Sequence, residues 1–152
     1  MPLPQPEEGF ATIVIAAPPE KVYDLVADIT RTGEWSPECV RAEWVGGATA
    51  PAAGARFHGY NKAGGFEWDV PCEVGQAEPG RVFSFKAPVD YEGASTWTYS
   101  FEAEGAGTRL TESFHAPLLN VEGSPSNFDG RYEMMVAGCE ATLANIKAAA
   151  ER

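Results

Sequence analysis

Two polar side chains stand among aromatic residues in the second half of the chain and are its candidates for acid–base chemistry. Tyr99 and Glu112 lie in segments that alternate apolar and polar residues, and both fall in the apolar phase. Such alternation is typical of strands with one buried face. A carboxyl group in an apolar layer is desolvated, which raises its pKa and suits it to proton transfer near neutral pH. The pattern therefore predicts Glu112 as an acid or base and Tyr99 as a hydrogen-bonding partner for a ligand carbonyl.

Structural interpretations of the same residues remain open. Glu112 could instead pair with Arg131 or another basic group, and Tyr99 and Tyr132 could be core rings with satisfied hydroxyls. Arg131 lies near the start of the last predicted helix, where it either meets an acidic ligand or is solvated. Trp35 either covers the core as a lid or contacts the ligand directly.

Other chemistries find no support in the residue pattern. His58 and His115 fall on different predicted strands, with no i, i+4 pair and no cysteine ligand nearby, so we expect no metal. Nucleophile-elbow, phosphate-loop and dinucleotide motifs are missing, and we expect no cofactor. Cys39, Cys72 and Cys139 are odd in number and far apart, which indicates reduced thiols in a cytoplasmic protein.

Composition and charge favour one globular domain. The chain has 152 residues with 22 acidic and 11 basic side chains, a formal net charge of -11. This charge repels phosphate backbones and anionic bilayers, so we expect neither a nucleic-acid partner nor membrane insertion. The N-terminal residues lack the features of a signal peptide. We expect an irregular tail over residues 1–9, a single domain over 10–152, and a monomer or homodimer.

Seven strands separated by glycine-rich turns are predicted, with neighbours pairing antiparallel. They are Phe10–Ile15, Val40–Val45, Ala55–Lys62, Phe66–Gln76, Arg81–Ala87, Ser95–Ala103 and Thr108–Ala116. Pro71 cannot donate to a strand ladder, which predicts a bulge or bend there. A short helix follows Pro18 and Pro19, and residues 30–37 form a second short helix or a loop.

The last segment predicts a long helix over residues 126–149, capped by Ser124, Ser126 or Asn127. Its apolar residues recur every three or four positions: Phe128, Tyr132, Met135, Val136, Cys139, Leu143 and Ile146. At about 1.5 Å per residue this helix is about 36 Å long and needs a whole sheet to cover its apolar stripe. The order of elements therefore predicts an α+β domain in which a curved seven-stranded antiparallel sheet wraps around the helix.

The concave face of that sheet is rich in aromatic residues with a few polar atoms among them, as in small-molecule pockets. The opposite interpretation is that these rings simply fill the core. The predicted ligand-contacting residues are Trp35, Phe57, Asn61, Trp68, Phe85, Trp97, Phe128, Arg131, Tyr132 and Met135.

Several stretches of the chain match a known family. They are residues 13–23, 33–39, 54–59, 79–85, 107–112 and 142–147. With these motifs the sequence resembles the polyketide cyclase/dehydrase branch of the START-like superfamily, the SRPBCC proteins. The resemblance implies a helix-grip fold with a deep cavity for lipids, sterols, polyketides or plant hormones, in a bacterial protein.

Three functions are compatible with this resemblance, because a fold does not fix a function. The first is binding of a small hydrophobic molecule, aromatic or polycyclic, in the cavity. The second is a cofactor-independent cyclase or dehydratase that uses Glu112 and Tyr99 for proton transfer. The third is a protein-interaction module resembling a co-chaperone.

Overall fold

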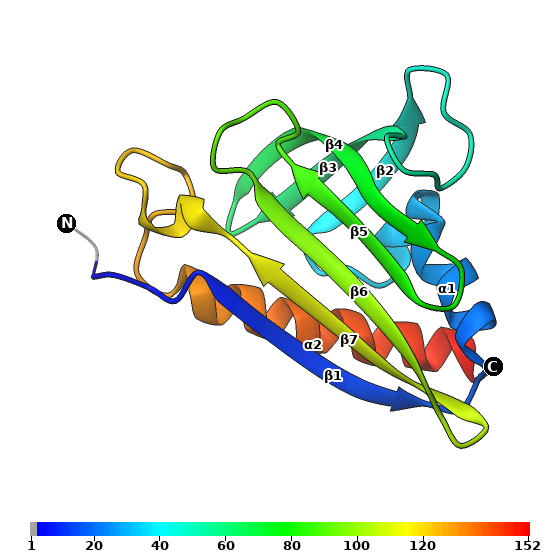
Figure 1. Cartoon of the computed structure of the whole chain (residues 1–152). Helices are drawn as coiled ribbons and strands as arrows, with labels where there is room; N and C mark the ends of the chain where they lie inside the picture. Colours follow the sequence, from blue (N-terminus) through cyan, green and yellow to red (C-terminus); the bar gives the residue numbers. More distant parts are fainter. Residues whose placement is uncertain (1–2) are drawn as a thin grey trace.

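A single curved antiparallel sheet forms the frame of the computed structural model, which describes residues 3–152 (Figure 1). The strands lie in the order β1-β7-β6-β5-β4-β3-β2. Their bounds are β1 Glu8–Ile15, β2 Cys39–Val45, β3 Arg56–Ala63, β4 Phe66–Glu78, β5 Val82–Ala87, β6 Ser95–Glu104 and β7 Gly107–His115. The long helix α2 (Arg131–Ala150) lies along the concave side of the sheet. The predicted α+β helix-grip architecture is confirmed.

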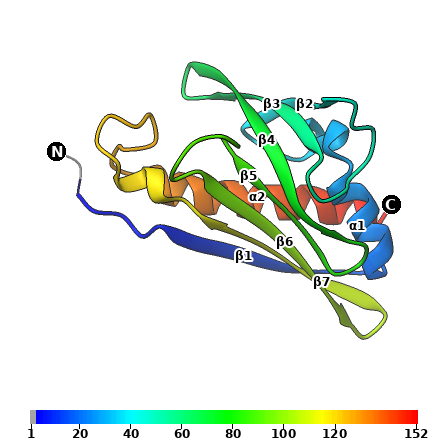
Figure 2. The ribbon, with the colours of Figure 1, turned by 45° about the horizontal axis from the view of Figure 1, so that its top comes forward.

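Short helices cover the end of the sheet nearest the C-terminal half of α2. Helix α1 (Pro19–Ala27) and the 3-10 helix η1 (Ile29–Glu34) connect β1 to β2, and a second 3-10 helix, η2 (Pro117–Asn120), follows β7. Figure 2 shows α1 beside the last turns of α2. Pro19 occupies the first turn of α1, where its missing N–H costs no hydrogen bond.

The strand ladder differs from the prediction at Pro71. Pairing between β3 and β4 is regular there, with Pro71 opposite His58, and the irregularity lies between Val74 and Ala77 on the β4–β5 side. The Pro71 carbonyl accepts a hydrogen bond from the Val89 N–H at 2.8 Å. The Pro71 nitrogen therefore also faces that side, beyond the end of β5, where no ladder donor is needed. The predicted bulge at Pro71 is wrong.

Helix α2 begins five residues later than predicted. Gly130 precedes it with a left-handed φ of 90°, which ends the turns of residues 117–130 before the helix starts. The Ser124 hydroxyl accepts from the Ser126 N–H within this segment, so neither serine caps α2. Phe128 therefore lies outside the helix and is 41% exposed.

Gln5 supplies the cap that the sequence near α2 does not. Its side-chain Oε1 accepts from the Tyr132 N–H at 2.9 Å, and its Nε2 donates to the Phe128 carbonyl at 3.1 Å. The Gln5 N–H donates to Asn120 Oδ1 at 2.9 Å, and Asn120 Nδ2 donates to the Gln5 carbonyl at 2.8 Å. The expected tail is thus hydrogen-bonded to both ends of residues 117–130, and β1 begins at Glu8 rather than Phe10.

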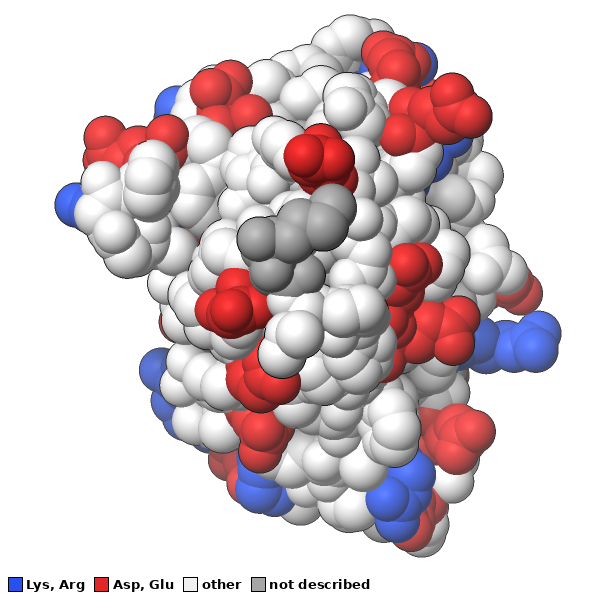
Figure 3. Space-filling model, turned by 90° about the vertical axis from the view of Figure 1, so that its left-hand side faces the viewer, with Lys and Arg blue, Asp and Glu red and all other residues white. Residues whose placement is uncertain are grey.

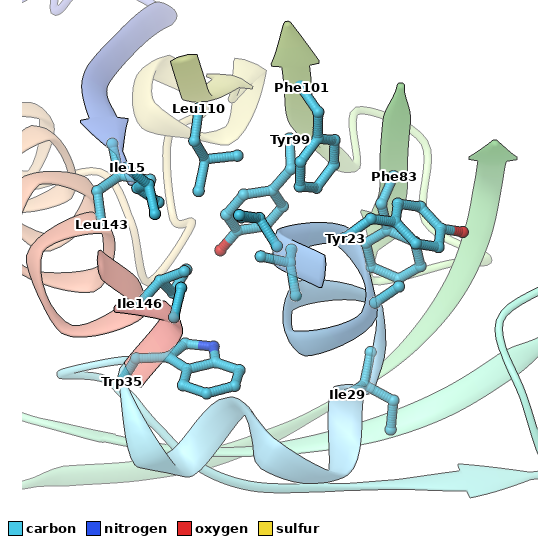
Figure 4. Close-up of a cluster of buried hydrophobic side chains, with 14 of the residues drawn as sticks. Ile15, Tyr23, Ile29, Trp35, Phe83, Tyr99, Phe101, Leu110, Leu143 and Ile146 are labelled. Atoms are coloured by element: carbon cyan, nitrogen blue, oxygen red, sulfur yellow. The ribbon is translucent and has the colours of Figure 1, made fainter. Parts of the chain in front are cut away.

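The core fills the space between the sheet and the C-terminal half of α2 (Figure 4). Its fully buried side chains come from β1, α1, β5, β7 and α2 and include Ile15, Val22, Phe83, Leu110, Leu143 and Ile146. A second cluster near the start of α2 contains Phe114, Leu119, Met135 and Cys139. No helix within residues 3–152 is long and apolar enough to cross a membrane.

We predict that Gln5→Ala lowers the free energy of unfolding by about 1–2 kcal/mol, because it removes a helix cap and leaves partners in the 117–132 region unpaired. Chemical denaturation measures the change. The matched control is Gln76→Ala, since the Gln76 side chain is exposed on β4 and makes no hydrogen bond. Equal stabilities of the two variants would contradict the capping role of Gln5.

Candidate functional site

A cavity of about 330 Å³ lies between the concave face of the sheet, η1 and α2. Most of its walls are apolar or aromatic. Residues that the sequence predicted as ligand contacts and that line it are Trp35, Phe57, Asn61, Trp68, Phe85, Trp97, Arg131 and Met135, together with the predicted catalytic residues Tyr99 and Glu112. The tertiary structure thus brings together side chains from seven separate segments of the chain.

Two predicted contacts lie elsewhere. Tyr132 packs edge-on against Phe114, with ring centroids 5.9 Å apart, and is not among the lining residues. Phe128 is also outside the lining, because the late start of α2 places it on the exposed segment before the helix. The left-handed Gly130 explains the position of Phe128 only, since Tyr132 lies within α2 and packs against Phe114 instead of the cavity.

Several lining residues had no signal in the sequence pattern. Ser124, Pro125 and Ser126 line the cavity from the segment between η2 and α2, where no regular periodicity exists. Glu38, Cys39 and Cys72 also line it. Glu38 precedes its strand and belongs to no regular element.

Tyr99 and Glu112 form the polar centre of the cavity. They sit directly opposite each other on β6 and β7, and the Tyr99 hydroxyl donates to Glu112 Oε2 at 2.9 Å. Glu112 is 5% exposed, and its Oε1 has no hydrogen-bond partner among the described residues. Figure 4 shows the Tyr99 hydroxyl pointing away from its own strand, into the space between the sheet and α2.

Burial makes Glu112 a weak acid. Desolvation raises the pKa of its carboxyl to about 8, although the Tyr99 hydroxyl and the nearby Cys139 thiol act in the opposite direction. Burial and the neighbouring carboxyl also raise the pKa of Tyr99 well above its ordinary value. At neutral pH the pair is therefore a protonated carboxyl and a protonated phenol, which can hydrogen-bond a ligand without carrying charge.

Arg131 is paired with Glu38, not with Glu112. Its guanidinium donates to both carboxylate oxygens of Glu38, with Nη2 3.1 Å from Oε2. The interpretation in which Arg131 neutralises Glu112 is wrong, as is the one in which Arg131 is solvated, since it is only 9% exposed. The residue of α2 beside Glu112 is Cys139, about two helical turns beyond Arg131.

The histidines lie away from the cavity. His58 contacts Asp69 through its Nε2, and His115 is exposed at the end of β7. Neither lines the cavity. Within residues 3–152, no cluster of His, Cys, Asp and Glu side chains has the grouping that a metal ion needs.

A curved antiparallel sheet closed by one long helix over an apolar cavity defines a helix-grip protein of the ligand-binding SRPBCC type. Residues 10–151 match the family described as polyketide cyclase / dehydrase and lipid transport. The chain belongs to this family, as its motifs predicted. No protein of curated function matches the chain in sequence.

Solved structures agree with this assignment. A polyketide-cyclase-like protein from Corynebacterium glutamicum is 33% identical, with the match covering 97% of this chain and 93% of that one at a TM-score of 0.63. A protein from Chromobacterium violaceum has a TM-score of 0.74 at 18% identity, covering 97% and 99% of the two chains. The di-domain ARO/CYC protein StfQ from the steffimycin biosynthetic pathway has a TM-score of 0.72 at 18% identity, covering 95% of this chain and 50% of StfQ. The last two likenesses show the shared fold.

We predict that Glu112→Gln removes a pH-dependent loss of stability. The folded protein keeps the Glu112 proton up to about pH 8, whereas the unfolded chain releases it near pH 4.5, so the wild-type free energy of unfolding falls as pH rises between these values. Glutamine carries no charge and still accepts from Tyr99. The variant should therefore gain stability relative to wild type from pH 5 to pH 9, by a few kcal/mol as an order of magnitude.

Denaturant unfolding at both pH values measures this difference. Glu102→Gln on the exposed face of β6 is the control and should leave the pH dependence unchanged. A Glu112→Gln profile parallel to that of wild type would show that Glu112 titrates as a solvated carboxyl.

Proposed function

We propose that this protein binds a small hydrophobic molecule, aromatic or polycyclic, in the cavity between the sheet and α2. One observation carries the proposal: the cavity has aromatic walls from β3, β5 and β6 around the buried, hydrogen-bonded polar pair of Tyr99 and Glu112. Apolar walls with a few convergent polar groups are the usual construction of small-molecule sites.

The size of the cavity supports the same conclusion. Protein interiors are close-packed, and unfilled apolar space of this extent lowers stability. A volume of about 330 Å³ lies at the lower end of the range for ligand pockets, about 300–1,000 Å³. Gly59 on β3 also lies in its wall and presents no side chain to it.

The relatives point to the class of ligand. The family description names polyketides and lipid transport, and StfQ and BexL are ARO/CYC proteins of biosynthetic pathways. A neutral carboxyl beside a phenol suits a ligand that carries a carbonyl or hydroxyl oxygen on an apolar skeleton. Polycyclic ketones and phenols, and sterols among the lipids, have this character.

The proposal also includes the cellular setting. Three free cysteines suit the reducing cytoplasm of a bacterial cell. The excess of acidic side chains, spread over the end of the molecule that carries residues 117–130 (Figure 3), argues against nucleic-acid partners. A monomer or a homodimer would both leave the cavity within one chain.

We predict that aromatic polyketides, flavonoids or sterols quench the tryptophan fluorescence saturably, because Trp35, Trp68 and Trp97 all line the cavity. Trp97→Phe should lose a large part of the quenching. Trp44→Phe is the matched control, since Trp44 packs against Phe57 without lining the cavity and should leave the quenching intact. If no class in such a panel, fatty acids included, binds saturably, the proposal fails. The co-chaperone-like interaction module then becomes the better-supported function.

A cyclase or dehydratase activity is the second candidate, and the position of Glu112 favours it. A buried acid with a pKa of about 8 can give and take a proton near neutral pH, with the Tyr99 hydroxyl in contact. The cavity would hold a flexible polyketide in one folded shape, and such confinement lowers the barrier to ring closure. No cofactor is needed for these steps.

For a substrate that the protein turns over, Glu112→Gln should lower kcat by about 10²- to 10⁴-fold while the Kd changes little, because the amide keeps the hydrogen bond but cannot transfer the proton. Single-turnover kinetics and equilibrium dialysis separate the two quantities. Tyr99→Phe should lower kcat less, since it removes only a donor to Glu112. Unchanged turnover in Glu112→Gln would rule out this mechanism.

A further inference from the structure

The lining of the cavity carries more acidic than basic side chains. Among the described residues that line it, those with acidic or guanidinium side chains are Glu38, Asp69, Glu112 and Arg131. Asp69 contacts His58 and is largely exposed, with 63% of its side chain accessible. Within residues 3–152, Arg131 is therefore the one cation of the lining, and a bound carboxylate would depend on it for a partner.

Glu38 already occupies Arg131. The two residues form a forked pair through both guanidinium nitrogens and both carboxylate oxygens, with side-chain exposures of 10% and 26%. Glu38 itself is fixed, because its carbonyl accepts from the Lys62 N–H at 2.8 Å and its N–H donates to the Ser36 hydroxyl. A ligand carboxylate could reach the guanidinium only by displacing a bidentate partner that the backbone holds in place.

Among the described lining residues, none besides Arg131 would give an anion a positive charge, and the others offer at most neutral donors such as the Asn61 amide. Glu112 and Tyr99 are uncharged when protonated. A ligand anion beside the buried Glu112 would be repelled by an ionised Glu112 carboxylate, so burial favours the uncharged form of both groups. An unpaired anion in an apolar cavity has a large desolvation cost. A neutral oxygen has a much smaller desolvation cost than an anion and can hydrogen-bond to the Tyr99–Glu112 pair.

We infer that the cavity selects uncharged ligands over carboxylates and that Glu38 determines this selectivity by neutralising Arg131. The inference rests on the proposed ligand-binding function and narrows it. Neutral ketones, phenols and alcohols on an apolar skeleton are the ligand class, and free fatty acids and aromatic acids are excluded. Glu38 acts here as a specificity-determining residue, although nothing in the periodicity of the sequence distinguishes it.

The test compares two probes of nearly the same shape, 2-acetonaphthone and 2-naphthoate, by isothermal titration calorimetry at pH 7. Wild-type protein should bind the ketone at least about tenfold more tightly than the acid, which is ionised at this pH. Equal or tighter binding of 2-naphthoate would overturn the inference while leaving the proposed function standing. If neither probe binds, and no larger ketone or sterol binds either, the proposed function itself fails.

Glu38→Gln is the diagnostic variant, because it frees Arg131 while keeping a side chain of the same shape. It should bind 2-naphthoate at least about tenfold more tightly than wild type does, through a charge-assisted hydrogen bond to the guanidinium. The double variant Glu38→Gln/Arg131→Gln leaves no charge at this position and should again prefer the ketone.

Circular dichroism verifies that each variant is folded. If Glu38→Gln does not fold, the wild-type comparison and the double variant still decide the question. A double variant that bound 2-naphthoate more tightly than the ketone would contradict the role of Arg131 as the cavity's cation. A folded Glu38→Gln protein with wild-type selectivity would show that Glu38 does not determine the selectivity.

Discussion

The fold depends on a mismatch between a wide curved sheet and the single helix that closes it. Seven antiparallel strands form a concave surface, and α2 crosses it with 20 residues. The C-terminal half of α2 packs tightly, where Leu143 and Ile146 meet Ile15 and α1 covers the end of the sheet. Arg131, Met135 and Thr142 of the same helix line the cavity. One helix thus contributes both to the packed core and to the cavity wall.

Polar groups near the cavity are arranged so that each charge is neutralised or removed. Arg131 and Glu38 neutralise each other, and burial keeps Glu112 protonated beside Tyr99. A buried ion pair of this kind contributes little net stability, because desolvation offsets the attraction between the charges. The pair instead leaves the Arg131 guanidinium unavailable to a ligand carboxylate. The same desolvation that makes Glu112 a proton donor near neutral pH makes the cavity unsuited to anions.

Local patterns predicted the sheet well, because alternation reports which side of a strand is buried. Phe57, Trp97, Tyr99 and Glu112 were all placed on the inner face by counting alone. The helix start was predicted badly. Apolar spacing continued back to Phe128, but the left-handed Gly130 and the hydrogen bonds of Gln5 define where α2 begins, and Gln5 is 127 positions from the N–H that it caps.

The sequence by itself determined the inward face of the strands that carry the aromatic residues, the aromatic character of the cavity and the family, because these properties reside in neighbouring residues and short motifs. Only the tertiary structure decided which charges meet. Asp129 and Glu133 are each two residues from Arg131 in the sequence, yet its partner is Glu38, because the segment before β2 folds against the start of α2. Pairing between distant segments depends on the curvature of the whole sheet, which no local pattern encodes.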